Sequence, residues 1–250
     1  MAPGEAPATG IHMFLDRYHS VSGGWIRIRA VQASRFARDV AGDYNPIHNP
    51  DARRFCVPGD LLFALVLAYG GLYERMRFEF RGMVGDDVPL RVPGTGAGRV
   101  QVIDADDRVV LDVEREGACT RDPAVVEAVA LRYVAFSGKN FPYLKPLMAE
   151  KGVMFNTDRP MVVYRNMGLD LQRLDIADPR LALSDSTLEV NGRRADALLR
   201  FGIHAPGGSR AGTGWKTLLL GGLREYDEVK VRGLMDEFER LRRADAAERE

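Results

Sequence analysis

Hydrophobic and polar residues follow two different periods in the first part of the chain. Residues 24–30 (GWIRIRA) alternate as in a β-strand, and residues 31–42 (VQASRFARDVAG) have the period of a helix. Residues 57–76 are apolar on nearly every face beyond Asp60, which is typical of a helix that other structure surrounds.

After this apolar helix the period becomes two. Residues 76–82 (MRFEFRG) and 108–116 (RVVLDVERE) each put alternate apolar residues on one face, with shorter strand-like stretches between them. One strand, a buried helix and a run of antiparallel strands predict an α+β layer, in which a sheet curls around a helix.

The second half of the chain repeats this order of elements. Residues 124–136 are helical in pattern, and residues 143–152 predict a second helix that ends at Gly152. Four strand-like stretches follow, at residues 164–174, 181–190, 195–205 and 214–226. A repeated order of this kind predicts a duplicated fold.

The junction between helix and loop repeats as well. Residues 41–48 (AGDYNPIH) align without gaps to residues 137–144 (SGKNFPYL), and both copies keep the glycine and the proline. The acid and the imidazole of the first copy are replaced in the second: Asp43 aligns with Lys139, and His48 aligns with Leu144. We therefore expect one half to have lost its acid and its imidazole.

Composition narrows the classes of protein. Lys plus Arg equals Asp plus Glu, 35 against 35, which argues against a nucleic-acid partner. Cys56 and Cys119 are too few for a disulfide framework or a cysteine metal cluster. The first residues carry no secretory signal, and the most apolar run, residues 61–73, is shorter than the roughly 20 residues that span a bilayer. We expect a cytoplasmic protein without a membrane span.

Several motifs have ordinary structural explanations. The glycines in residues 94–98 lie between strand-like residues, so they predict a hairpin turn and not a dinucleotide loop. Residues 212–217 (GTGWKT) fail as a phosphate loop because Trp215 separates the glycine from the lysine. No two histidines have metal-ligand spacing, and Cys56 in its apolar stretch is expected to behave as a small hydrophobe.

Residues 40–55 (VAGDYNPIHNPDARRF) are the strongest candidate for chemistry. They combine Asp43, Asn45 and His48 in six residues. A helix end with turn-forming residues would explain the glycine, the amide and the proline without any function. The alternative is a site, because an apolar helix begins eleven residues after His48 and its first turn offers unpaired N–H groups.

This stretch resembles the hydratase signature of the MaoC-like hotdog family, which includes (R)-specific 2-enoyl-CoA hydratases. The signature residues are Ala41, Gly42, Asp43, Tyr44, Asn45, Pro46, Ile47 and His48, with Asp51 following. The whole chain also resembles an uncharacterised bacterial family of double-hotdog proteins that share the run NPIH…RFCVPGDLLFA. The resemblance implies an α+β double hotdog, in which two antiparallel sheets each wrap a central helix and pack as a pseudo-dimer.

The resemblance also implies roles for four residues. Asp43 and His48 would together hold the water that adds to an enoyl thioester, Asn45 would brace the loop, and the Gly59 N–H would polarise the thioester carbonyl. No cofactor and no metal is implied. The chain departs from the family at Pro58-Gly59, where hydratases usually carry His-Gly, in a shorter loop, and at Asp60, whose charge would repel an enolate if it pointed inward.

The expected organisation has four parts. Residues 1–12 form a disordered leader, residues 13–120 a hotdog with the hydratase-like motif, residues 121–228 a degenerate hotdog, and residues 229–250 a charged helical tail. The wrapped helices are expected at residues 57–76 and at about residues 141–152.

Two functions remain open from the sequence. One is a hydratase or dehydratase of 2-enoyl-CoA or a related acyl thioester, with a single active site in the first half. The other is a non-catalytic protein that binds acyl-CoA or an acyl-carrier thioester on the same scaffold. A homodimer of double hotdogs is one open oligomeric state.

Overall fold

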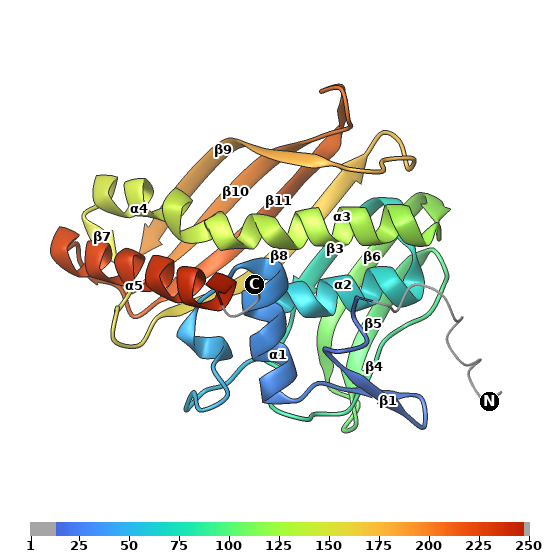
Figure 1. Cartoon of the computed structure of the whole chain (residues 1–250), viewed down its shortest axis with the longest axis horizontal. Helices are drawn as coiled ribbons and strands as arrows, with labels where there is room; N and C mark the ends of the chain where they lie inside the picture. Colours follow the sequence, from blue (N-terminus) through green and yellow to red (C-terminus); the bar gives the residue numbers. More distant parts are fainter. Residues whose placement is uncertain (1–13, 248–250) are drawn as a thin grey trace.

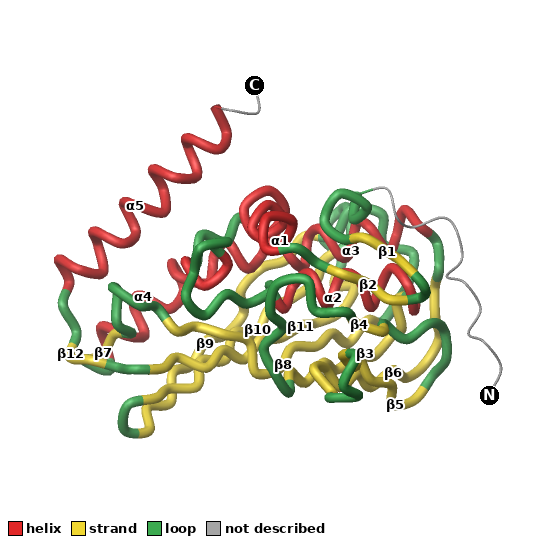
Figure 2. Tube along the Cα trace, turned by 90° about the horizontal axis from the view of Figure 1, so that it is seen from below, coloured by secondary structure: helices red, strands yellow, loops and turns green. Residues whose placement is uncertain are grey.

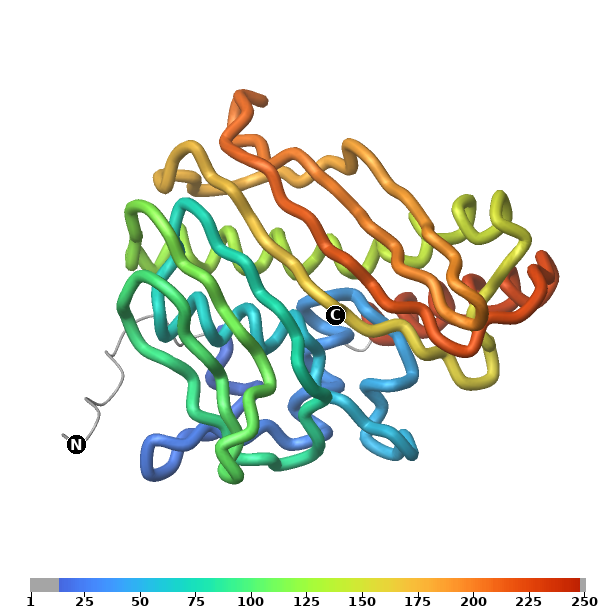
Figure 3. The backbone as a smooth tube through the Cα atoms, turned by 180° about the vertical axis from the view of Figure 1, so that it is seen from behind, coloured from blue at the N-terminus to red at the C-terminus, as the bar shows by residue number. Residues whose placement is uncertain are grey.

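The computed structural model describes residues 14–247, and the expected leader at residues 1–12 lies outside them. Its main feature is a ten-stranded sheet with the order β1-β2-β4-β5-β6-β3-β8-β11-β10-β9, in which the paired strands are antiparallel. The described helices gather on one face of this sheet, and the strands form the opposite face (Figures 1, 2 and 3). The predicted α+β class with antiparallel strands is confirmed.

The first half contributes six strands and two α-helices. The strands are β1 (Ser20–Ser22), β2 (Trp25–Arg27), β3 (Leu72–Phe80), β4 (Leu90–Arg91), β5 (Gly98–Asp104) and β6 (Val109–Thr120). The helical segments are α1 (Ala30–Phe36), the π-helical turn η1 (Ala37–Ala41), the 3₁₀ turn η2 (Pro46–His48) and α2 (Gly59–Gly70). Gly94 and Gly96 lie between β4 and β5, and Gly98 begins β5, as predicted for a turn between two strands.

The second half contributes the other elements. Its strands are β7 (Val153–Met154), β8 (Met161–Leu171), β9 (Arg180–Asn191), β10 (Arg194–His204), β11 (Arg210–Gly221) and β12 (Arg224–Glu225), of which β7 and β12 form a separate pair. Its helical segments are α3 (Pro123–Ala135), the 3₁₀ turn η3 (Phe136–Lys139), α4 (Asn140–Glu150) and α5 (Glu228–Ala247).

Strands β3 and β8 join the two halves into one sheet. Their register pairs Arg77 with Gly168, and Gly168 is needed there because a β-carbon would lie 2.7 Å from the Met76 carbonyl oxygen. The ring of Trp215 on β11 also occupies the space that this β-carbon would need. The close approach of three strands therefore depends on a residue without a side chain.

Helix α2 is the centre of the hydrophobic core. Every residue of it after Gly59 is buried, as the apolar sequence predicts. It packs against α3, where the rings of Phe63 and Tyr133 stack with centroids 4.3 Å apart. The predicted helix at residues 57–76 is wrong at its end, because Gly71 adopts a φ of +90° and the chain continues as strand β3.

The wrapped helix expected at about residues 141–152 is also corrected. A helix does occupy this region, as α4, but α3 is the one that packs along α2 in the core. The two are separated only by η3, so the second half has a nearly continuous helical segment across its strands (Figure 1). The periodicity showed both helices and could not show which of them lies in the centre.

Helix α5 confirms a helical pattern after residue 228 and adds contacts that the charged sequence did not predict. Phe238 is buried against the ring of Phe141 in α4, with centroids 4.9 Å apart. Near the end of the helix, Asp245 accepts a hydrogen bond from the Tyr44 hydroxyl at 3.0 Å. The helix therefore reaches back to the loop that carries Asp43 and His48.

Candidate functional site

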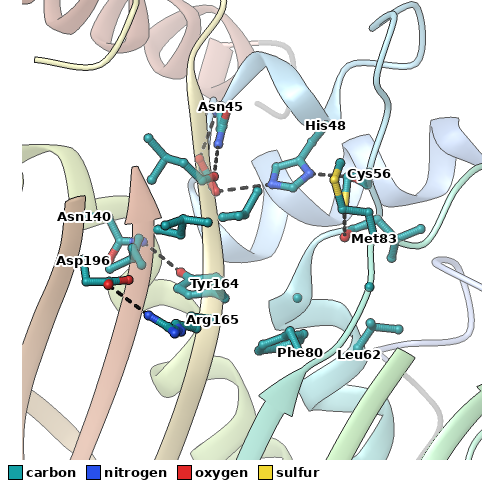
Figure 4. A pocket seen from close by; sticks show the side chains of 18 of the residues that line it. Asn45, His48, Cys56, Leu62, Phe80, Met83, Asn140, Tyr164, Arg165 and Asp196 are labelled. Carbon is teal, nitrogen blue, oxygen red and sulfur yellow. Dashed lines mark hydrogen bonds and ion pairs between the residues drawn. The ribbon is translucent and has the colours of Figure 1, made fainter. Parts of the chain in front are cut away.

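A pocket of about 660 Å³ lies where the two halves meet (Figure 4). One wall is the loop at residues 42–58, which we call the motif loop, together with the start of α2. The other wall comes from the second half, from the start of α4 and from strands β8, β10 and β11. The four residues predicted from the sequence all line this pocket: Asp43, Asn45, His48 and Gly59.

Asn45 holds the motif loop in place. Its backbone N–H donates to Asp43 Oδ1 at 2.9 Å, which closes a tight turn around the acid. Its side-chain Nδ2 donates to the Val162 carbonyl oxygen on β8 at 2.9 Å. The buried Asn45 amide therefore ties the loop of the first half to a strand of the second.

The tautomer of His48 follows from its backbone partner. His48 Nδ1 lies 2.7 Å from the carbonyl oxygen of Cys56, and a carbonyl can only accept, so Nδ1 carries the proton. In the neutral ring Nε2 then has a free lone pair, and it faces Asp43 Oδ2 at 3.7 Å. Two acceptors at this separation can each receive one O–H bond of the same water molecule.

Burial changes the acidity of Asp43. The loss of water around the side chain raises the pKa of Asp43 above its ordinary value, and His48 and the Asn45 N–H partly oppose this effect. A carboxyl group whose charged form is expensive to bury has a greater affinity for a proton.

Gly59 begins α2 and lines the same pocket as Asp43 and His48. A β-carbon at this position would lie 2.9 Å from the ring of Phe80 and 3.1 Å from that of Tyr164, so a larger residue would require these rings to move. Pro58 before it has no N–H, so Gly59 provides the first backbone donor of the helix. The first donors of a helix attract negative charge, such as that on a polarised carbonyl oxygen.

Asp60 points away from the pocket and into the core. Its carboxylate accepts from Lys216 Nζ at 3.0 Å, and both side chains are at most 2% exposed. The sequence position of Asp60 raised the concern that its charge would repel an enolate. Because the charge is paired in this way, that repulsion does not arise. Lys216 also donates to Ser137 Oγ at 2.6 Å and to the Tyr133 carbonyl oxygen at 3.0 Å.

This buried ion pair is connected to the pocket through side chains that the sequence patterns did not indicate. The Tyr164 hydroxyl donates to Ser137 Oγ at 2.7 Å and accepts from Asn140 Nδ2 at 2.8 Å. Tyr164 and Asn140 line the pocket, and Asn140 Oδ1 is buried without a hydrogen-bond partner among the described residues. Burial lowers the pKa of Lys216, although the charge of Asp60 opposes this.

One sequence signal could have pointed to the pair. Asp60 is the single charged residue in an otherwise apolar helix, which requires a buried partner. Lys216 occupies an inward position on β11, two residues before Leu218 and four before Leu220, which are both buried. The period of two therefore marks Lys216 as a buried cation.

Other candidate groups are inert or occupied. Burial raises the pKa of the Cys56 thiol to about 11, so the thiol stays protonated near neutral pH.

Within residues 14–247, no group of three or more His, Cys, Asp or Glu side chains is placed to hold a metal ion. None of the described helices is both long enough and apolar enough to cross a membrane.

The second copy of the motif lies against the first. A β-carbon on Gly138 would lie 2.8 Å from the Ala41 carbonyl oxygen, so the two aligned glycines meet at the junction. Arg242 of α5 donates to the carbonyl oxygens of both Gly42 and Gly138, at 3.4 and 3.3 Å. Leu144, which takes the place of His48 in the alignment, is fully buried.

Comparison with solved structures finds proteins with distant likeness. A tesB protein of Mycobacterium avium subspecies paratuberculosis is 13% identical, with a TM-score of 0.48, and the match covers 84% of this chain and 99% of that one. An acyl-CoA thioesterase II of Mycobacterium marinum is 14% identical, with a TM-score of 0.39 and coverages of 87% and 99%. A hot dog fold protein of Alicyclobacillus acidocaldarius is 8% identical, with a TM-score of 0.40 and coverages of 84% and 98%.

These likenesses are too weak to carry an argument about activity. No curated protein matches the sequence. A family model does match, over residues 13–229. This range contains the motif loop, both walls of the pocket and Lys216. The chain therefore belongs to the family described as Protein of unknown function (DUF3581).

Proposed function

We propose that the pocket binds an acyl thioester and that Asp43 and His48 activate a water molecule in it. The observation that carries this proposal is the pair of acceptor atoms, His48 Nε2 and Asp43 Oδ2, 3.7 Å apart in a pocket that Gly59, the first residue of α2, also lines. A water bound by both of its O–H groups directs its oxygen toward a substrate, and a helix N-terminus beside it suits a thioester carbonyl.

The reaction that the motif resemblance favours is the hydration of a 2-enoyl thioester. The water oxygen bonds to the β-carbon, and its proton passes to His48 Nε2. The electron pair of the double bond moves toward the carbonyl oxygen, where the Gly59 N–H stabilises the enolate. The His48 imidazolium, stabilised by Asp43, then returns the proton to the α-carbon.

The two halves have different tasks in this proposal. We regard the chain as a double hotdog in which the first half supplies the proton-transfer groups. The second half supplies the facing wall, with Tyr164 and Asn140, and the Val162 carbonyl that fixes Asn45. The buried Asp60–Lys216 pair keeps α2, and with it Gly59, in position against β11.

A substrate screen tests the proposal. The purified chain is incubated with crotonyl-CoA and longer 2-enoyl-CoAs, and loss of the conjugated double bond is followed together with release of free thiol. Hydration removes the double bond and releases no thiol. Attack of the same water on the carbonyl carbon would instead release CoA, and saturated butyryl-CoA would then also react. If no thioester turns over, the catalytic proposal is wrong.

A second candidate is a binding protein without turnover. Pro58 favours it, because a residue without an N–H stands where the related hydratases have a histidine, which leaves fewer donors for the carbonyl. This candidate predicts saturable binding of an acyl thioester with neither product formed. The same incubation, read beside a binding isotherm, distinguishes it from the enzyme.

A further inference from the structure

A second pocket, of about 750 Å³, lies on the other side of the motif loop and has a strongly basic lining. Five arginines from four separate segments of the chain surround it: Arg53, Arg54, Arg159, Arg193 and Arg224. The acidic residues in its lining are Asp51 and Asp158. The excess of positive charge is local, since the whole chain has 35 basic and 35 acidic residues.

These arginines differ from the ion-paired arginines of the surface in having no side-chain partner among the described residues. Arg132 pairs with Asp178 at 2.8 Å and Arg165 with Asp196 at 2.9 Å, for example. Within the described part of the chain, by contrast, no ion pair or side-chain hydrogen bond is found for any of the five, and all five are exposed. Unpaired guanidinium groups that converge on a hollow attract anions with several acceptor oxygens, above all phosphates.

The motif loop separates this basic pocket from the catalytic one by a single layer of chain. His48 lines the first pocket, while its neighbours Ile47 and Asn49 line the second. Met83 lines both pockets, so they adjoin at its side chain. A ligand with its anionic end among the arginines can therefore extend past Met83 toward the Asp43–His48 pair.

We propose that the basic pocket binds the phosphate groups of a nucleotide-bearing thioester carrier, of the kind found in coenzyme A. The inference rests on the proposed function and deepens it, because it names the part of the substrate that carries the acyl group. A compact polyanion fits better than a carrier protein, since the arginines line a hollow built from four segments of the chain and not a flat surface.

Direct binding tests the inference without any need for turnover. The full chain is titrated with coenzyme A, with 3′-phosphoadenosine 5′-phosphate, and with pantetheine, which lacks the nucleotide. Coenzyme A and the nucleotide should bind with an affinity that falls as salt rises, and pantetheine should bind much more weakly. The double variant Arg54→Glu/Arg193→Glu should weaken coenzyme A at least about tenfold, because charge-assisted contacts to phosphate are lost.

The control is Arg75→Ala, which removes an exposed arginine that pairs with Glu116 on β6. It should leave coenzyme A binding and its salt dependence unchanged. Equal affinity for coenzyme A and pantetheine, or equal effects of the control and the double variant, would overturn the inference. So would an acyl-carrier protein whose binding depends on Arg54 and Arg193 while that of coenzyme A does not.

Kinetics separate this inference from the catalytic proposal. If the chain hydrates enoyl-CoA, the double variant should raise KM and leave kcat nearly unchanged, and enoyl-pantetheine should react equally with both forms. If no thioester turns over but coenzyme A still binds in an arginine-dependent way, the catalytic proposal fails and the phosphate site stands.

Discussion

At the scale of single residues, the backbone fixes the tautomer of His48 on which the proposed proton transfer depends. The Cys56 carbonyl oxygen fixes the proton on Nδ1, and this leaves Nε2 free to accept one from water. Asp43, turned toward Nε2 by the Asn45 N–H, is the only carboxylate in contact with the ring among the described ion pairs. Loss of either side chain should therefore remove the same catalytic step.

The first prediction concerns these two side chains. His48→Ala and Asp43→Asn should each reduce turnover of the thioester by at least about a hundredfold, in kcat more than in KM, because positioned acid–base groups are worth about 10²–10⁴-fold in rate. The double variant should lose little more than either single one, since the two residues act as a unit. Steady-state kinetics on the purified variants measure both effects.

A matched control is His204→Ala, which removes a histidine at the far end of β10, outside the pocket. It should keep full activity. Thermal melts run beside the kinetics separate catalysis from folding, because the catalytic variants should melt as cooperatively as the unmodified chain. Full activity in His48→Ala would end the catalytic assignment.

The second prediction is a pH dependence that follows from Asp43. Because burial raises its pKa above the ordinary value of 3.8, the acidic limb of the kcat/KM profile should lie above that value. Activity should rise with pH as the carboxylate ionises. Asp43→Asn removes this ionisation, so the acidic limb of whatever activity remains should lie at a different pH, and a limb at the same pH in the variant would contradict the assignment.

The raised pKa of Asp43 also predicts that its ionised side chain lowers the stability of the folded protein at neutral pH. A carboxyl group whose pKa is raised in the folded state contributes stability below its unfolded pKa of 3.8, and this contribution is lost as pH rises through the folded pKa. Asp43→Asn should therefore melt at a higher temperature than the unmodified chain at neutral pH, and the difference should shrink on acidification. Melting curves across the pH range provide the measurement, and a variant that is less stable at neutral pH would count against it.

At the scale of elements, α2 and β11 are joined by a buried ion pair that is costly to break. Lys216 reaches from β11 to Asp60 in the first turn of α2, and its ammonium also lies 4.5 Å from the ring centroid of Tyr133. Removing one partner leaves the other charge buried and unpaired. Removing both leaves only uncharged polar groups without a partner, and this costs less free energy of folding.

The third prediction uses this asymmetry. Lys216→Met should lower the free energy of unfolding by about 3–5 kcal/mol, because Asp60 is left buried without its partner. Asp60→Leu combined with Lys216→Met should recover much of that loss. Denaturant unfolding of these two variants and of Asp60→Leu alone measures the free energies, and a double variant as unstable as the sum of the singles would show that the two groups are not coupled.

The elements also show where sequence patterns reach their limit. The apolar run beyond Asp60 predicted a surrounded helix correctly, since its apolar residues leave no face for water. Its end was predicted six residues too late, because Leu72, Met76 and their neighbours are apolar in either a helix or a buried strand. Only the φ of Gly71 separates the two, and φ is not readable from an apolar run.

At the scale of the whole molecule, the pocket belongs to both halves. The motif residues could be found from the sequence because they lie within six positions of one another. Asn140 and Tyr164 could not, because they reach the pocket only through the pairing of β3 with β8, which brings distant parts of the chain together. The same holds for the arginines of the basic pocket, which are far apart along the chain.

The fourth prediction is that each chain binds one thioester. The aligned glycines Gly42 and Gly138 meet at the junction of the halves, but the second copy carries Lys139 and Leu144 where the first has an acid and an imidazole. Leu144 is fully buried and has no group that exchanges a proton, so the second copy offers packing and no water-activating pair.

Calorimetric titration with butyryl-CoA, whose saturated chain cannot be hydrated, should therefore give a stoichiometry near one per chain. Light scattering on the same sample fixes the number of chains in the particle, so that one site per chain is distinguished from one site per dimer. Should butyryl-CoA be hydrolysed, a non-hydrolysable thioether analogue replaces it. Two equal sites per chain would mean that the second half binds thioesters without the acid and the imidazole, and the division of tasks between the halves would then be wrong.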